Sequence, residues 1–175
     1  MDWGNVRPLD GALGRPSAGT TRPEAMRTQR ILIAECHLPL PRPIRLGPIE
    51  IRTRNYVAIR MVTDAGSHGD AFGYPRATPL FDAVTAAAHQ FLGVEPSHRA
   101  AAIGRYLGAG ATVRPHLVRA ASLFDIALTD IFAKSVAAPL HHLLGAARTR
   151  VPVSAIAGYH CQERSIDDIA DEVRG

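Results

Sequence analysis

Residues 120–153, AASLFDIALTDIFAKSVAAPLHHLLGAARTRVPV, carry the strongest structural signal in this chain. The signal begins a few residues before this stretch, where apolar side chains start to recur at alternating spacings of four and three. They are Leu117, Ala121, Phe124, Leu128 and Ile131. Because this spacing puts side chains on one face of an α-helix, the sequence predicts a helix over about 115–135. Its apolar stripe requires a packing partner.

Shorter helices are expected on both sides of the long one. Thr78 is a suitable N-cap for a helix that Gly93 ends. A second helix is expected over 97–107. A helical piece at 139–144 is expected to end at Gly145, because glycine readily takes the left-handed conformation that follows many helices.

Three runs rich in β-branched and apolar residues precede the helices, at 30–38, 49–54 and 55–64. In the third run apolar residues alternate with more polar ones, which predicts a strand with one buried face and with Arg60 on the other. The turn-forming sequence DAGSHGD at 64–70 is expected to close this part. The sequence therefore predicts a three-stranded antiparallel meander followed by a helical bundle, an α+β fold.

The two ends of the chain differ from the middle. Residues 1–28 contain glycine, proline and arginine without a period and are predicted to form a flexible tail. VPVSAIAGY at 151–159 is predicted to be a strand buried on both faces, as in a parallel sheet. Ser165 and Asp168 have the spacing of a capping box at the start of another helix. Strand followed by helix is the opening unit of an α/β architecture, and the sequence stops there.

Composition excludes several classes of protein. The chain has 175 residues, is 46% hydrophobic and carries a net charge of +4, but its arginines are scattered among acids. A nucleic-acid-binding surface needs clustered basic residues, so we expect no nucleic-acid partner. No run of about 18 apolar residues and no signal-peptide core is present, so we expect no membrane partner and a cytoplasmic location. Cys36 and Cys161 are expected to be free thiols.

The stretch 120–153 resembles the long capping-domain helix of the mandelate racemase and muconate-lactonizing branch of the enolase superfamily. The matching positions are Asp125, Ala127, Leu128, Asp130, Lys134, Pro139, Leu140, Leu143, Leu144 and Gly145. Residues 57–74 are similar to the third strand and glycine-bearing hairpin of that family. Thr129 and Ala146 depart from the pattern, which usually has tryptophan and a second glycine there.

The resemblance implies a capping domain over 29–147 and, over 148–175, the first strand and helix of a TIM (β/α)₈ barrel that is incomplete here. Members abstract a proton α to a carboxylate and stabilise the resulting enediolate on Mg²⁺. The implied activity of the full-length enzyme is that of an acid-sugar dehydratase, racemase or cycloisomerase. Such an enzyme would bind Mg²⁺ and a small carboxylate and would be a homo-oligomer. No catalytic residue and no metal ligand is expected in this chain, so we expect it to be inactive alone and to hold no cofactor.

The resemblance also indicates which residues would select the substrate. The loops at 38–47 and 69–78 correspond to capping loops that close over the barrel mouth. Arg42, Arg45, Tyr74 and Arg76 are therefore candidate contacts of an anionic substrate. Tyr159 and His160 follow the first barrel strand and would lie at its catalytic face.

Other interpretations of the charged residues are structural. Lys134 follows Asp130 by four positions, which favours an ion pair on one helix over a catalytic base. Asp125 and Asp130 are about 140° apart around a helix and cannot bind one ion together. Two alternative functions remain open at this point: a stand-alone binding or dimerisation module that uses the long-helix stripe as its interface, and a complete small α+β enzyme that uses His160, Cys161 and an acid.

Overall fold

The computed structural model describes residues 7–11, 26–108, 114–146, 148–154, 156–158, 160 and 163–174. The chain divides into two compact units. Unit 1 comprises Met1–Cys36 and Asn55–Gly145, and unit 2 comprises His37–Arg54 and Ala146–Gly175.

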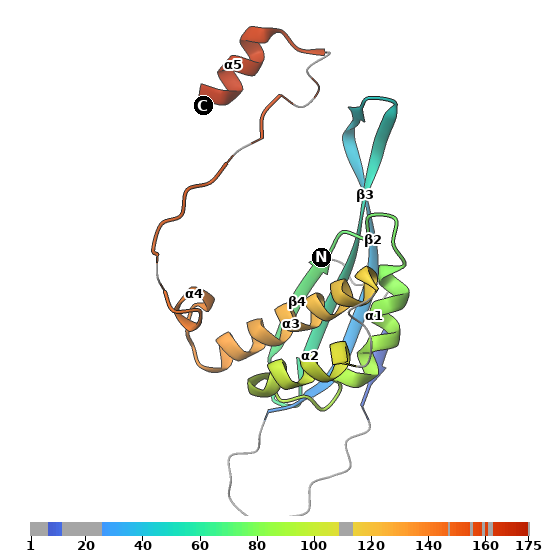
Figure 1. The fold of residues 1–175 in the computed structure, drawn as a ribbon, viewed down its shortest axis with the longest axis vertical. Helices are drawn as coiled ribbons and strands as arrows, with labels where there is room; N and C mark the ends of the chain where they lie inside the picture. Colours follow the sequence, from blue (N-terminus) through green and yellow to red (C-terminus); the bar gives the residue numbers. More distant parts are fainter. Residues whose placement is uncertain are drawn as a thin grey trace, which may run out of the picture. The chain divides into compact units, whose positions relative to one another are not determined.

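The strands form one four-stranded sheet in the order β1-β2-β3-β4 (Figure 1). Their bounds are β1 Arg7–Asp10, β2 Thr28–Leu46, β3 Ile49–Thr63 and β4 His68–Gly73. Strand β1 is antiparallel to β2 with Leu9 opposite Ile31, and β3 is antiparallel to β4 with Ile59 opposite Ala71. The predicted α+β class and antiparallel sheet are confirmed, with one strand more than expected.

Two of the four strands, β1 and β4, were not predicted, and β1 lies in the region predicted as a flexible tail. Arg7–Asp10 form β1, and Leu9 packs against the hydrophobic core. Thr28 is fully buried, and its backbone N–H and side-chain hydroxyl both donate to the carbonyl of Val94, over 3.0 and 3.1 Å. The tail prediction is therefore wrong at these residues, because four residues are too few to show a strand period.

Strand β3 joins the two runs 49–54 and 55–64, which were expected to be separate strands with a short loop at 53–55 between them. Those residues, Thr-Arg-Asn, contain neither glycine nor proline, so the extended backbone continues through them into one strand. The turn instead follows Thr63, whose N–H donates to the carbonyl of Ser67 over 2.8 Å. Gly66 has a φ of 79°, and the chain returns as β4. Residues 68–70 of the predicted turn 64–70 are thus the start of the fourth strand.

Residues 38–47, predicted as a loop, belong to the outer part of β2 and its turn to β3. Pro39, Pro41 and Pro43 occupy alternate positions of that strand. Alternate residues of a strand direct their backbone N–H groups to the same edge, so the three missing donors fall on one edge. Prolines are tolerated in a strand on an unpaired edge. The proline spacing is therefore compatible with a long hairpin.

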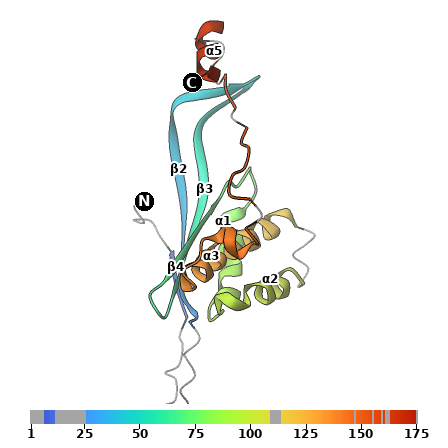
Figure 2. The same cartoon turned by 90° about the vertical axis from the view of Figure 1, so that its left-hand side faces the viewer.

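Helices cover one face of the unit 1 sheet (Figure 2). The helices of unit 1 are α1 Leu80–Ala88, η1 His89–Phe91, η2 Pro96–His98, α2 Arg99–Gly108, α3 Pro115–Ser135 and α4 Leu140–Leu143, of which α4 contacts α3 and buries none of its residues. Helix α3 packs against β4, α1 and α2. The predicted helix 115–135 is confirmed. Among the described residues, no helix combines the length and the apolar character needed to cross a bilayer.

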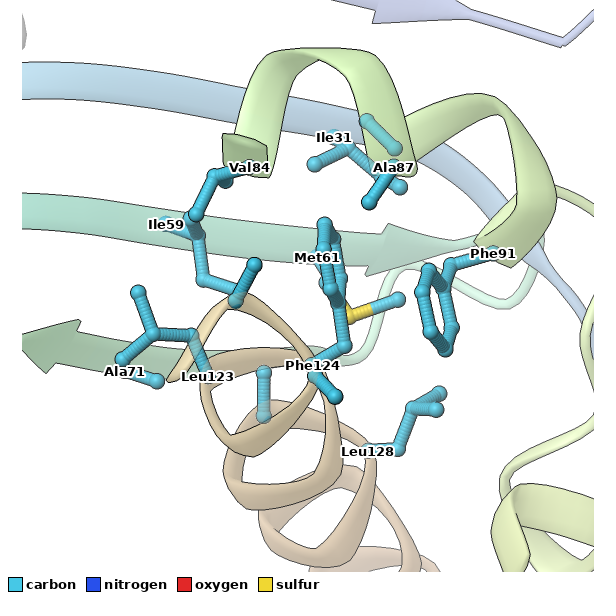
Figure 3. Close-up of a cluster of buried hydrophobic side chains, with 14 of the residues drawn as sticks. Ile31, Ile59, Met61, Ala71, Val84, Ala87, Phe91, Leu123, Phe124 and Leu128 are labelled. Carbon is cyan, nitrogen blue, oxygen red and sulfur yellow. The ribbon is translucent and has the colours of Figure 1, made fainter. Parts of the chain in front are cut away.

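The core of unit 1 lies between the sheet and these helices (Figure 3). The long-helix stripe is buried there: Phe124, Leu128 and Ile131 are all fully inaccessible to solvent. The rings of Phe91 and Phe124 stack with centroids 4.1 Å apart and planes 9° apart. The sheet contributes residues such as Ile59 of β3, which also has no exposed surface.

Unit 2 contains the hairpin of residues 37–54 and a C-terminal segment with helix α5, Ile166–Arg174. The predicted capping box is confirmed: the Asp168 N–H donates to Ser165 Oγ over 3.1 Å, and the Ser165 N–H donates to Asp168 Oδ2 over 3.0 Å. The hydrogen bonds from Ser165 lower the pKa of Asp168. Helix α5 thus has a well-formed start.

The predicted strand at 151–159 does not appear in the part of this segment that the structure describes. Residues 151–154 and 156–158 are neither helix nor strand, and Val151, Val153 and Ile156 are 67–87% exposed. A strand needs a neighbour that accepts and donates its backbone hydrogen bonds. The described residues provide no such neighbour for this run.

Candidate functional site

The loop between β4 and α1, residues 74–79, has an unusual backbone. Arg76 and Ala77 have φ values of 48° and 57°, and the Thr78 N–H donates to the carbonyl of Pro75 over 3.0 Å. Positive φ at both central residues is the mark of a type I′ turn, which normally uses asparagine and glycine. An arginine and an alanine in this conformation are strained, and such strain persists only where the surroundings hold it.

Thr78 is part of this turn and does not cap α1 as predicted. Helix α1 has Pro79 at its N-cap position and no side-chain cap. The Thr78 hydroxyl instead donates to the Pro75 carbonyl, and the Thr78 carbonyl accepts a hydrogen bond from the Leu80 N–H over 2.7 Å. Because the turn already uses the hydroxyl, it is not available to the helix.

Arg119 of α3 connects the long helix to the loop. Its Nη1 donates to the Pro75 carbonyl over 2.8 Å and lies 3.3 Å from Thr78 Oγ1, and its Nη2 donates to the Tyr74 carbonyl. The guanidinium is a planar donor with several N–H groups, which allows one side chain to bind two consecutive carbonyls. Sequence reasoning missed Arg119, because its partners are 41–45 residues away along the chain.

Tyr74 of the loop forms an aromatic cluster with Tyr56 of β3 and Phe72 of β4. The ring centroid of Tyr56 is 5.7 Å from that of Phe72, in an edge-to-face arrangement, and 6.0 Å from that of Tyr74. Tyr56 and Phe72 are on the face of the sheet away from the helices. Their sequence neighbours Val57 and Ala71 are buried in the core, and successive residues of a strand point to opposite faces. Phe72 is 65% exposed. The cluster therefore presents an aromatic surface next to the strained turn.

The same face of the sheet carries an ion pair between Arg60 and Asp70. The residues are direct cross-strand partners, with Nε to Oδ1 at 2.7 Å and Nη2 to Oδ2 at 2.8 Å. The hydrogen bonds from Arg60 hold the pKa of Asp70 below its ordinary value. This two-pronged geometry is the strongest form of a surface ion pair.

We expect Asp70→Asn to cost about 0.5–1 kcal/mol of stability at neutral pH, since the pair is partly exposed and screened. The folded-state pKa is lowered, so this contribution is present above the unfolded-state value of about 4. It is lost as the pH falls through the folded-state pKa. Urea unfolding of both proteins between neutral pH and pH about 2 should show the curves converging in acid. A difference that stays constant with pH would contradict the assignment.

The sequence-predicted site residues fall into both units. Tyr74 and Arg76 lie together in the β4–α1 loop of unit 1, Tyr74 half-buried and Arg76 exposed. Arg76 makes no hydrogen bond or ion pair with the rest of the described chain. Its charge is therefore available to a ligand.

The remaining candidates belong to unit 2. Arg42 and Arg45 are exposed on β2, and their odd separation puts them on opposite faces of a regular strand, so the two do not face one ligand together. His160 is half-buried with a φ of 61°, and its carbonyl accepts a hydrogen bond from the Glu163 N–H over 2.9 Å. Tyr159 and Cys161 lie outside the described residues, and Cys36 is a free thiol.

The comparison with known families identifies most of unit 1. Residues 29–145 match the family described as "Mandelate racemase / muconate lactonizing enzyme, N-terminal domain". The chain belongs to this family. The match includes the hairpin, the β4–α1 loop and Arg119, and it ends before His160. The family resemblance predicted from residues 120–153 is confirmed.

The chain is also similar to several dehydratases. The D-galactonate dehydratase family member ManD of Chromohalobacter salexigens is 35% identical over 129 residues, which cover 69% of this chain and 30% of that protein. The L-talarate/galactarate dehydratase of Salmonella typhimurium LT2 is 25% identical, with a TM-score of 0.62 over 78% of this chain and 38% of its own. The L-talarate dehydratase of Polaromonas sp. JS666, solved with Mg and L-glucarate, is 26% identical. Its TM-score is 0.63, and the match covers 70% of this chain and 36% of that protein.

The chain thus spans about a third of the length of these relatives. Its described residues do not fit a magnesium site of the family. No three histidine, cysteine, aspartate or glutamate side chains gather among them. Asp130 instead pairs with Lys134 over 2.6 Å, and Asp125 pairs with Arg99 over 3.4 Å. The structural interpretation of these two aspartates is confirmed.

Proposed function

We propose that this chain is the substrate-specificity domain of a magnesium-dependent acid-sugar dehydratase, and that the β4–α1 loop contacts the substrate carboxylate. The observation that carries the proposal is the exposed, unpaired Arg76 on a strained turn, inside the part of the chain that matches the family. Functional loops concentrate such strain where a side chain must be held in one direction. The relatives named above are dehydratases, which favours this reaction over racemisation or cycloisomerisation.

The chemical role of the loop is recognition of charge. An arginine donates two parallel hydrogen bonds to a carboxylate, and these bonds are about twice as strong as neutral ones. We place no magnesium ion and no proton transfer on the described residues. In this proposal both belong to the remainder of the enzyme, and 148–175 begin its barrel domain.

Arg42, Arg45, Tyr159 and His160 remain predictions of substrate contact in the same enzyme. Homo-oligomerisation of the full-length enzyme likewise stays a prediction. The alternative of a dimerisation module is less well supported, since the long-helix stripe that it would use is buried within unit 1.

The proposal can be tested in a chimera. Residues 29–145 of this chain would replace the corresponding domain of the Salmonella L-talarate/galactarate dehydratase, and turnover of L-talarate, galactarate and other acid sugars would be measured with Mg²⁺. We expect the chimera to dehydrate at least one acid sugar. Arg76→Met in this chimera is expected to raise KM about tenfold with little change in kcat, because we expect the arginine to bind the carboxylate equally in the ground state and in the transition state.

Arg105→Met is the matched control, since Arg105 is an exposed arginine on α2. A folded chimera without activity toward any acid sugar would count against the proposed function. Equal effects of the two arginine substitutions would reject the role of Arg76 but would leave the proposed function of the domain untouched. Gel filtration of the chain itself tests the alternative, which requires a stable dimer of defined stoichiometry.

A further inference from the structure

We infer that Arg119 is a positioning residue that holds the β4–α1 loop in its left-handed conformation and so fixes the direction of Arg76. The inference goes beyond the proposed function, which concerns the residue in contact with the substrate. It rests on the proposed function in one respect: that function explains why the loop would need a fixed conformation.

The turn needs an external support because its own residues disfavour it. A non-glycine residue in the left-handed region brings its Cβ close to a neighbouring carbonyl oxygen, and Arg76 and Ala77 both adopt such values of φ. Within the turn, the described hydrogen bonds are those from the Thr78 N–H and hydroxyl to the Pro75 carbonyl. The same carbonyl also receives Nη1 of Arg119 at 2.8 Å.

Arg119 reaches both sides of the strained pair. Its two terminal nitrogens bind the carbonyls of Tyr74 and Pro75, which precede Arg76, and Nη1 is also near the hydroxyl of Thr78, which follows Ala77. The ends of the turn are therefore held by one rigid planar group. That group is anchored on α3, whose neighbouring residues Ala120 and Leu123 are buried in the core. The loop thus takes its orientation from the most extensively packed helix of unit 1.

The two arginines have different roles. Arg119 is half-buried and donates to backbone carbonyls, whereas Arg76 is exposed and its N–H groups are available to a ligand. Arg119 therefore holds the loop in place, and the loop presents Arg76 to solvent. Lysine at 119 would supply a point charge but not a planar fork, so it would replace the support only in part.

Amide hydrogen exchange of the 175-residue chain tests the inference directly. The Thr78 amide reports opening of the turn, because its partner is the Pro75 carbonyl. We expect Arg119→Met to accelerate exchange at Thr78 about tenfold, as loss of charge-assisted hydrogen bonds of this kind predicts. Exchange at the buried β3 residues Ile59 and Met61 should change by less than about twofold, because local opening leaves the core closed. Arg119→Lys should give an intermediate acceleration, and Arg105→Met should give none.

A second substitution separates positioning from general stabilisation. In the Ala77→Gly background, where glycine takes positive φ without steric cost, Arg119→Met should accelerate Thr78 exchange by no more than about threefold. Trypsin cleavage after Arg76, quantified by mass spectrometry, should follow the same order, because proteases require an opened loop.

Two results would overturn the inference. Equal acceleration at Thr78, Ile59 and Met61 would mean that Arg119 supports only the whole fold. Unchanged exchange at Thr78 would mean that the turn does not depend on it. Since both readouts use the chain without substrate, the inference and the proposed function can fail separately.

Discussion

Replacing Phe124 by alanine is expected to lower the free energy of unfolding by about 3–5 kcal/mol, the cost of emptying a buried aromatic site. Phe124 has no exposed surface, and its ring stacks on that of Phe91 (Figure 3). The substitution therefore removes both the burial of one ring and the stacking that joins α3 to η1. Because domains have only about 5–15 kcal/mol of stability in total, the variant should be close to unfolding. Its melting temperature should fall by roughly 6–20 °C.

Phe72→Ala is the matched control for this prediction. Phe72 is also a phenylalanine in ring contact with another aromatic residue, but it is 65% exposed on the face of the sheet away from the helices. Its replacement should cost less than about 1 kcal/mol, as is usual for surface positions. Urea unfolding followed by circular dichroism measures both variants. If the two substitutions cost the same, Phe124 is not the centre of the core.

The helices could be predicted from the sequence because their signals are local. The stripe from Leu117 to Ile131 alone defines a face of a helix, and α3 has the bounds that this spacing predicts. The capping box at Ser165 and the left-handed glycine at Gly145 are equally local, and both are confirmed. In each case the residues that decide the conformation are within one or two turns of one another.

The strands were less predictable because their limits depend on distant partners. Strand β1 exists through its pairing with Arg30–Ile33, residues that follow it by about twenty positions. Judged locally, the prolines at 39, 41 and 43 predict the end of a strand. They nevertheless lie within β2, where their alternate positions remove hydrogen-bond donors from one edge only. The apolar run at 151–157 satisfies the local rule for a strand but finds no partner among the described residues.

Of the residues around the β4–α1 loop, Tyr74 and Arg76 were named as candidates from the sequence, but Arg119, which supports the loop, was not. Tyr74 and Arg76 were named because the family resemblance assigns them to a capping loop, and their contact with a substrate stays a prediction. Nothing local distinguishes Arg119 from the other arginines, and its role follows only from the packing of α3 beside the loop. Residues that position a site from another element generally require the tertiary structure for their recognition.

Gly69→Ala is expected to destabilise the chain by about 3 kcal/mol or more, because β4 and α3 approach too closely for a side chain there. A Cβ at this position would lie 2.1 Å from the carbonyl oxygen of Ala127 and 2.9 Å from Cγ1 of Ile131. The first of these atoms belongs to the backbone of α3, so relief requires the whole helix to move away from the sheet. That movement would also separate Lys134 from the carbonyl of His68, which it binds over 2.9 Å.

The matched control for this prediction has the opposite expected sign. Gly104 lies in α2 with nothing within 4 Å of an added Cβ, so Gly104→Ala should stabilise the chain by about 0.5–1 kcal/mol through helix propensity. Thermal unfolding monitored by circular dichroism distinguishes the two alanines directly. A second variant identifies the clashing atom: Ile131→Ala removes Cγ1 but leaves the Ala127 carbonyl in place. Combining it with Gly69→Ala should therefore give no rescue, and recovery of stability in the double variant would show that the side chain, not the helix backbone, sets the closest approach.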